Sequence, residues 1–150
     1  GNRSIVDRME PGDLFGESFA CVGESLPVSV VAVEDSAVIF IDSRRICVSC
    51  SNACAFHSRM IYNLLRLVAS KTLVYDQKIQ ITSKRTTREK LMTYLLHQAK
   101  LHGSNRFAIP YDRQELADYL EVDRSGLSAE ISKMRKEGIL ESSKHHFTLL

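Results

Sequence analysis

The chain has 150 residues, of which 44% are hydrophobic and 25% are charged, and its formal net charge is +2. This composition is typical of a globular protein and excludes a disordered, collagen-like or low-complexity chain. No apolar run is long enough to span a bilayer and no signal-peptide pattern opens the sequence, so we expect a cytoplasmic protein with no membrane partner.

Residues 1–46 are predicted to form β structure. Runs rich in β-branched residues occupy positions 28–33 and 37–42, and turn residues separate them. Such a short antiparallel set cannot bury both of its faces, and Gly1 is not an initiator methionine. We therefore expect a truncated chain with a tag-derived Gly1, which lacks the strands that would pair here.

A helical period replaces the β pattern from about residue 53 to residue 83, and no Gly or Pro interrupts it. A helix of this length with an apolar stripe near heptad spacing commonly pairs with a second copy of itself. The alternative is that the stripe packs against the chain's own sheet, which we expect to be partly true. The predicted homodimer interface consists of Ile61, Leu64, Leu65, Val68, Tyr75 and Ile79.

Residues 84–150 are predicted to contain helices and short strands. Thr86 and Glu89 have the spacing of a capping box and open a helix that ends near Gly103. A short strand is expected at residues 106–110. The basic excess also lies in this part, because residues 84–150 hold 12 Lys or Arg against 9 Asp or Glu.

Two short amphipathic helices are expected at residues 112–120 and 124–137, joined by a tight turn, with a hairpin at residues 139–150. This order is the plan of a winged helix-turn-helix, in which the second helix presents its N-terminal residues to the major groove of DNA. The guanidinium of an Arg at the tip of that helix, such as Arg124, can donate hydrogen bonds to both the O6 and N7 acceptors of a guanine.

One alternative is that these charged residues only form a solvent-exposed helix face. The other is that the winged helix binds a partner protein. The basic hairpin that follows the helices favours double-stranded DNA as the partner, because a basic wing is not needed for folding. The predicted DNA contacts are Arg113, Arg124, Ser125, Ser128, Lys133, Arg135 and Lys144.

The segment from Phe15 to Ser18, the long helix and the segment from Arg113 to Ala117 together resemble the cyclic-AMP receptor protein/fumarate-nitrate regulator (Crp/Fnr) family of bacterial transcription regulators. The resemblance implies an α+β fold: a partial β-barrel, which is an incomplete cyclic-nucleotide-binding-like jelly roll, then a long dimerisation helix and a C-terminal winged helix-turn-helix. The expected boundaries are residues 1–52, 53–83 and 84–150.

The same resemblance implies a homodimer on a palindromic site, with RNA polymerase as a further candidate partner. The family's base-reading positions fall on Arg124, Ser125 and Ala129. Only the first of these matches the residue type of the cyclic-AMP receptor, so we expect a different operator sequence.

The effector side departs from the family pattern. The family's phosphate cassette matches Gly16 and Glu17, but its Arg-Ser pair falls on Leu26 and Pro27, which cannot neutralise a phosphate. We therefore expect no cyclic nucleotide, and the effector stays unidentified. The pocket that would hold it is expected to include Gly16, Glu17, Ser18, Tyr75 and Asp76.

Four soft metal-ligand residues lie close together at Cys47, Cys50, Cys54 and His57. Small cysteines at a strand-to-helix junction are also common in packed interiors, and we favour this structural or free-thiol interpretation. Metal or redox sensing through the cysteines is the alternative function. No catalytic triad order, HExxH, P-loop or dinucleotide-binding turn is present, so we expect no enzyme.

Overall fold

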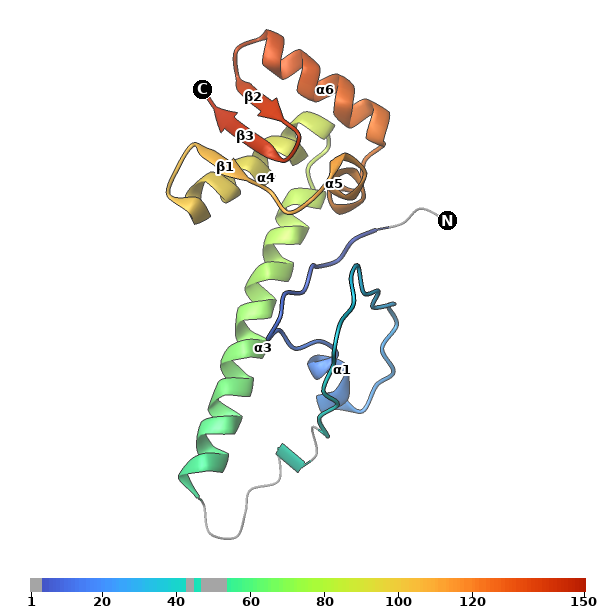
Figure 1. The fold of residues 1–150 in the computed structure, drawn as a ribbon, viewed down its shortest axis with the longest axis vertical. Coiled ribbons are helices and arrows are strands. Elements are labelled where there is room, and N and C mark those ends of the chain that lie inside the picture. Colours follow the sequence, from blue (N-terminus) through green and yellow to red (C-terminus); the bar gives the residue numbers. More distant parts are fainter. Residues whose placement is uncertain (1–3, 43–44, 47–53) are drawn as a thin grey trace. The chain divides into compact units, whose positions relative to one another are not determined.

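The computed structural model describes residues 4–42, 45–46 and 54–150. The chain divides into two compact units, one formed by Met9–Val74 and the other by Gly1–Arg8 with Tyr75–Leu150. Helix α3 (Ala55–Thr82), shown in Figure 1, contributes residues to both units.

In the unit Met9–Val74, a short helix α1 (Glu17–Val22) is joined to α3 by a buried ion pair. The Nζ atom of Lys71 lies 3.2 Å from a carboxylate oxygen of Glu17 and also donates a hydrogen bond to the carbonyl of Leu14. Both charged side chains are largely removed from water, so each would be costly to bury without the other. This pairing ties α1 to α3.

The described part of residues 1–46 contains no strand, so the prediction of β structure there is wrong for these residues. Residues 28–33 and 37–42 have no regular secondary structure and are exposed, and Phe40 is 96% exposed. A strand requires a neighbour that takes up its backbone hydrogen bonds and an element that covers its apolar face. The two runs do not pair with each other, and the described residues form no barrel.

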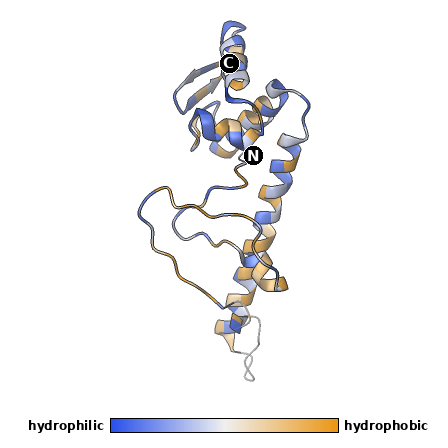
Figure 2. Ribbon diagram, turned by 90° about the vertical axis from the view of Figure 1, so that its right-hand side faces the viewer, coloured by the Kyte–Doolittle hydropathy of each residue, from blue (hydrophilic) through white to orange (hydrophobic). Residues whose placement is uncertain are grey.

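Helix α3 confirms the predicted long helix, although residue 53 lies outside the described residues. Only Lys78 and Ile81 of its 28 residues are buried. Apolar and polar residues alternate along it (Figure 2). In the described part of the chain, no helix combines the length and the apolar character needed to cross a bilayer.

The second unit contains helices and a small sheet, in the order predicted from the sequence. Its helices are α4 (Thr87–His102), α5 (Arg113–Leu120) and α6 (Arg124–Lys136). Its strands are β1 (Arg106–Ala108), β2 (Leu140–Ser143) and β3 (His146–Leu149), which form an antiparallel sheet in the order β1-β3-β2. The predicted hairpin is thus confirmed, with β2 and β3 as its arms.

Local capping explains where α4 begins and ends. The Thr86 side chain accepts a hydrogen bond from the Glu89 backbone N–H, and the Glu89 carboxylate accepts one from the Thr86 backbone N–H, so the predicted capping box is confirmed. Gly103 ends the helix in a left-handed conformation with φ of 60°, which a residue without a Cβ adopts at little cost.

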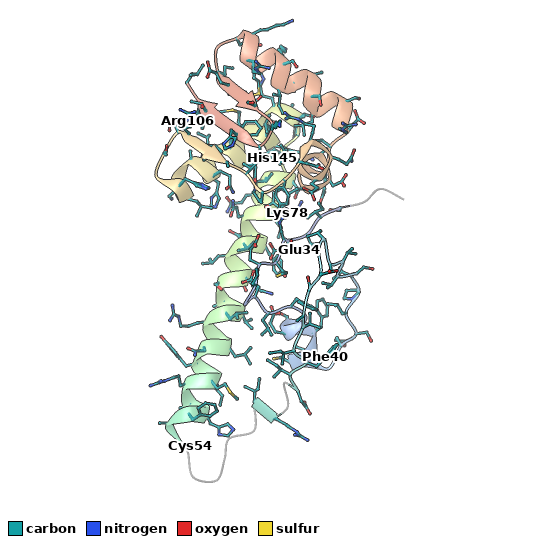
Figure 3. All side chains as sticks on the ribbon, in the orientation of Figure 1. Glu34, Phe40, Cys54, Lys78, Arg106 and His145 are labelled. Carbon is teal, nitrogen blue, oxygen red and sulfur yellow. The ribbon has the colours of Figure 1, made fainter. Side chains whose placement is uncertain are left out.

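The C-terminal end of α3 is held to α5 by a buried lysine, labelled in Figure 3. The Nζ atom of Lys78 donates a hydrogen bond to the Tyr119 carbonyl and lies 4.1 Å from the centroid of the Tyr119 ring. It is also 3.8 Å from a carboxylate oxygen of Glu121. Burial lowers the pKa of the Lys78 amine, and the nearby Glu121 partly opposes that shift.

Candidate nucleic-acid interface

Buried apolar side chains hold α5 and α6 together. Leu116 and Leu120 of α5 and Leu127, Ile131 and Met134 of α6 are all at most 3% exposed. They belong to one core cluster with residues of α4 and of the sheet. The helix pair therefore has a fixed geometry, as a groove-reading device requires.

Short polar residues set the ends of the two helices. Asp112 and Glu115 form a capping box at the start of α5, with both hydrogen bonds 2.8 Å long. Glu121 ends α5 in a left-handed conformation with φ of 54°, an uncommon one for a residue with a side chain. Asp123 then caps α6 by accepting a hydrogen bond from the Gly126 backbone N–H.

The tip of α6 is exposed. Arg124 and Ser125 lie in its first turn, and Arg124 has no ion pair within the described residues. The Ser125 hydroxyl donates to the Asp123 carboxylate, and this bond, with the bond from the Gly126 backbone, lowers the pKa of Asp123. Since a serine has one O–H, Ser125 can accept a hydrogen bond from a base in this arrangement but must leave Asp123 to donate one.

The predicted contact residues of α6 lie on two faces of the helix. At about 100° per residue, Ser125, Ala129 and Lys136 follow one outward stripe, opposite the buried leucine, isoleucine and methionine. Lys133 lies beside this stripe and is also exposed. Arg124, the half-buried Ser128 and Arg135 lie together on one flank.

The Arg113 side chain is more buried than the sequence indicates. Its guanidinium carbon lies 5.9 Å from the centroid of the buried Phe147 ring, and its Nη1 atom is buried without a hydrogen-bond partner among the described residues. Burial, and next the positive charge of Arg124, lower the pKa of Arg113. Helix α5 therefore places a half-buried positive charge, that of Arg113, near Arg124 at the tip of α6.

The turn of the hairpin, or wing, is anchored to the segment before α5. The His145 carbonyl accepts a hydrogen bond from the Ile109 N–H, and the His145 Nδ1 atom lies 2.9 Å from the Tyr111 carbonyl oxygen. The position of His145 at this turn is visible in Figure 3. Lys144 is exposed beside it, with φ of 52°. No pattern in the sequence indicates the anchoring role of His145.

A second residue missed by the sequence analysis is Arg88 in the first turn of α4. Its Nε donates to Glu130 at 2.6 Å, and its Nη2 donates to Glu137 at 2.7 Å. These two hydrogen bonds raise the pKa of Arg88. The partners are 42 and 49 residues away along the chain, so no local pattern identifies them.

The predicted effector residues fall in different units. Gly16, Glu17 and Ser18 belong to Met9–Val74, where the Glu17 carboxylate is already paired with Lys71. Tyr75 and Asp76 belong to the other unit, and Asp76 accepts a hydrogen bond of 2.9 Å from the side chain of Gln80. Their common pocket stays a prediction.

The predicted dimer stripe on α3 is largely accessible. Leu65 and Ile79 are 65% and 63% exposed, and Ile61 and Tyr75 are exposed to a smaller extent. Leu64 and Val68 are half-buried.

Of the predicted cysteine cluster, Cys47 and Cys50 lie outside the described residues. Cys54 precedes α3 and is labelled in Figure 3; its Sγ atom lies 3.2 Å from the Nδ1 atom of His57. The described residues contain no group of three or more side chains that could hold a metal ion.

Comparisons with known proteins agree with this geometry. Residues 89–150 match a Crp-like helix-turn-helix domain. Over 155 aligned residues the chain is 23% identical to the transcriptional activator protein FnrA of Stutzerimonas stutzeri, with all of this chain and 62% of FnrA covered. The structure of FixK2 from Bradyrhizobium japonicum matches with a TM-score of 0.56 and 19% identity, over 73% of this chain and 54% of FixK2.

The chain therefore spans about three-fifths of the length of FnrA. The structure of FixK2 shares the fold of the matched part, and the curated match is named a transcriptional activator. Residues 89–150 are therefore identified as a Crp-like helix-turn-helix domain, and the whole chain is similar in sequence to the transcriptional activator FnrA.

Proposed function

We propose that the chain is a DNA-binding transcription regulator whose helix α6 enters the major groove. The observation that carries this proposal is the outward stripe of α6, which is exposed and free of carboxylates, beside a flank that holds Arg124 and Arg135. An Arg at the tip of a recognition helix can read guanine, and cations further along the helix can hold the backbone.

Each predicted contact has a role in this proposal. Arg124 reads a base edge, and Ser125 and Ser128 contact a base edge or a phosphate. Arg113, Lys133, Arg135 and Lys144 contact phosphates and hold the register. The hydrogen bonds of His145 support the wing role of Lys144, because they anchor the turn that carries it.

We infer that the active form is a homodimer paired through α3. The support is the exposed apolar stripe: an unpaired helix with Leu65 and Ile79 in water would be unusual for a stable protein. A dimer would present two copies of α6 to two half-sites of a palindrome. RNA polymerase is then the partner through which bound protein would affect transcription.

The N-terminal part is proposed to sense an effector. Residues 1–52 would be the effector-sensing part, residues 53–83 the dimer helix and residues 84–150 the DNA-binding domain. Leu26 and Pro27 support an effector other than a cyclic nucleotide.

The function is tested by selecting bound duplexes from a random pool and measuring the affinity of the selected sequence. We expect a reproducible, roughly palindromic motif and a tighter affinity for it than for scrambled DNA of the same composition. Equal affinity for all duplexes, with and without cell extract that supplies an effector, contradicts the proposal. A protein-interaction module would likewise select no motif.

A second candidate function is redox or metal sensing through Cys47, Cys50, Cys54 and His57. The contact between Cys54 and His57 favours it, because a thiol and an imidazole, both of which are metal-ligand groups, lie 3.2 Å apart there. Metal analysis of anaerobically purified protein, with the variant Cys54→Ser as control, tests this function. Absence of bound metal, together with DNA affinity that thiol oxidation does not change, would exclude it.

A further inference from the structure

Helix α6 and the residue that caps its C-terminal end carry two carboxylates, and both are held by one arginine of another helix. Glu130 and Glu137 are seven residues apart and so lie on the same flank of α6, opposite the flank of Arg124 and Arg135. Arg88 contacts the first through Nε and the second through Nη2, at 2.6 and 2.7 Å. One planar guanidinium therefore spans two turns of α6.

The position of Arg88 places this contact at the start of α4. Arg88 is the second residue of α4, next to the capping box of Thr86 and Glu89 that starts the helix. Its neighbour Lys90 donates a hydrogen bond of 3.2 Å to the Glu121 carbonyl at the end of α5. The first turn of α4 thus holds both helices of the helix-turn-helix by side-chain hydrogen bonds.

The charges of these glutamates matter for a polyanionic partner. Glu130 is six residues from Arg124, so the two are at least about 9 Å apart, which is comparable to the Debye length of about 10 Å at 0.1 M salt. At low salt, where screening extends further, an unpaired carboxylate on α6 would repel the phosphates that Arg124 approaches. Paired with Arg88, the two glutamates carry one uncompensated negative charge instead of two.

We propose that Arg88 is a positioning residue for DNA binding, which fixes the orientation of α6 and offsets the charge of Glu130 and Glu137 without touching a base. This inference rests on the proposed function. It explains why α6 can carry two acidic residues and still bind DNA. It also makes the first turn of α4 part of the DNA-binding machinery.

The test compares affinities for the selected duplex in a mutant cycle. Arg88→Gln should weaken binding about tenfold at low salt, and the loss should shrink as salt screens the exposed carboxylates. In the background Glu130→Gln/Glu137→Gln, the same Arg88→Gln change should cost less than about twofold, because no charge is left to offset. Arg106→Gln removes the same charge from exposed β1 and should leave the affinity within about twofold.

The possible outcomes separate the explanations. A loss that persists in the Glu130→Gln/Glu137→Gln background means that Arg88 contacts DNA directly and overturns the inference. A loss that does not change with salt and accompanies a lower melting temperature indicates a purely structural role and also overturns it. Unchanged affinity in Arg88→Gln overturns it as well. If the unmodified protein binds no duplex, the proposed function fails first and this inference fails with it.

Discussion

The ring centroids of Tyr94 and Tyr119 lie 5.4 Å apart in the core of the DNA-binding domain, and the Tyr94 hydroxyl is buried without a hydrogen-bond partner among the described residues. Tyr111 stacks on Tyr119 at 4.9 Å, so three tyrosines form one cluster. The cluster lies between α4, α5 and the segment that anchors the wing. Its aromatic packing stabilises the domain, whereas the unpaired hydroxyl destabilises it.

The first prediction follows from that hydroxyl. Tyr94→Phe keeps the ring and removes the unpaired O–H, so the free energy of unfolding should stay the same or rise by about 1 kcal/mol. Tyr94→Ala should lower it by about 3 to 5 kcal/mol, because it leaves a cavity. Urea denaturation of both variants checks this, and a clear loss of stability in Tyr94→Phe would show that the hydroxyl has a partner.

The same cluster predicts a dependence on alkaline pH. Burial raises the pKa of Tyr94, Tyr111 and Tyr119 above the ordinary value of 10.0. Above pH 10 the unfolded chain loses these protons while the folded chain keeps them, so stability is full below about pH 10 and falls as pH rises further. Tyr94→Phe should reduce this fall, as measured by unfolding midpoints between pH 8 and 11; an identical fall in the variant would contradict the assignment.

Arg124 is predicted to read one base pair. Arg124→Ala should cost about 1 to 3 kcal/mol on the selected site and relax the preference at one position in each half-site. Arg135→Ala, on the same flank at the other end of α6, should weaken binding to all sequences alike. Affinities for single-base variants of the site check both, and an equal loss for Arg124→Ala on every sequence would remove its base-reading role.

Lys144 is predicted to contact the DNA backbone from the wing. Lys144→Ala should weaken binding to specific and non-specific DNA and reduce the magnitude of the salt slope by about 1. Lys100→Ala removes a charge from the exposed end of α4 and should leave the slope unchanged. Affinities over a range of salt concentrations give the slope; the same slope in Lys144→Ala and the unmodified protein would exclude the wing from the interface.

Val68 is predicted to lie in the dimer interface. Val68→Glu places a charge in the apolar stripe of α3 and should produce a monomer, because an unpaired buried carboxylate is costly. Ser70→Glu introduces the same charge on an exposed position about 200° further round the helix and should leave the dimer intact. Light scattering distinguishes the two states, and a dimer in Val68→Glu would place the interface elsewhere.

The helices and the hairpin of the C-terminal domain could be predicted because their signals are local. The capping boxes of Thr86 with Glu89 and of Asp112 with Glu115 join residues three apart, and the apolar period of α3 repeats within one turn or two. Hydrogen bonds and periodicities of this kind depend little on the rest of the chain. The position of Arg124 at the start of α6 follows from them.

Only the tertiary structure decided the contacts that join distant residues. Arg88 meets Glu130 and Glu137, Lys78 meets Tyr119, and no spacing in the sequence marks either pairing. The exposed runs at 28–33 and 37–42 show how a local preference fails without a partner. Their β-branched residues favour a strand but cannot form one without a hydrogen-bonded neighbour. Local preferences therefore determined the helices, whereas long-range partners decided which side chains are buried, paired or left in water.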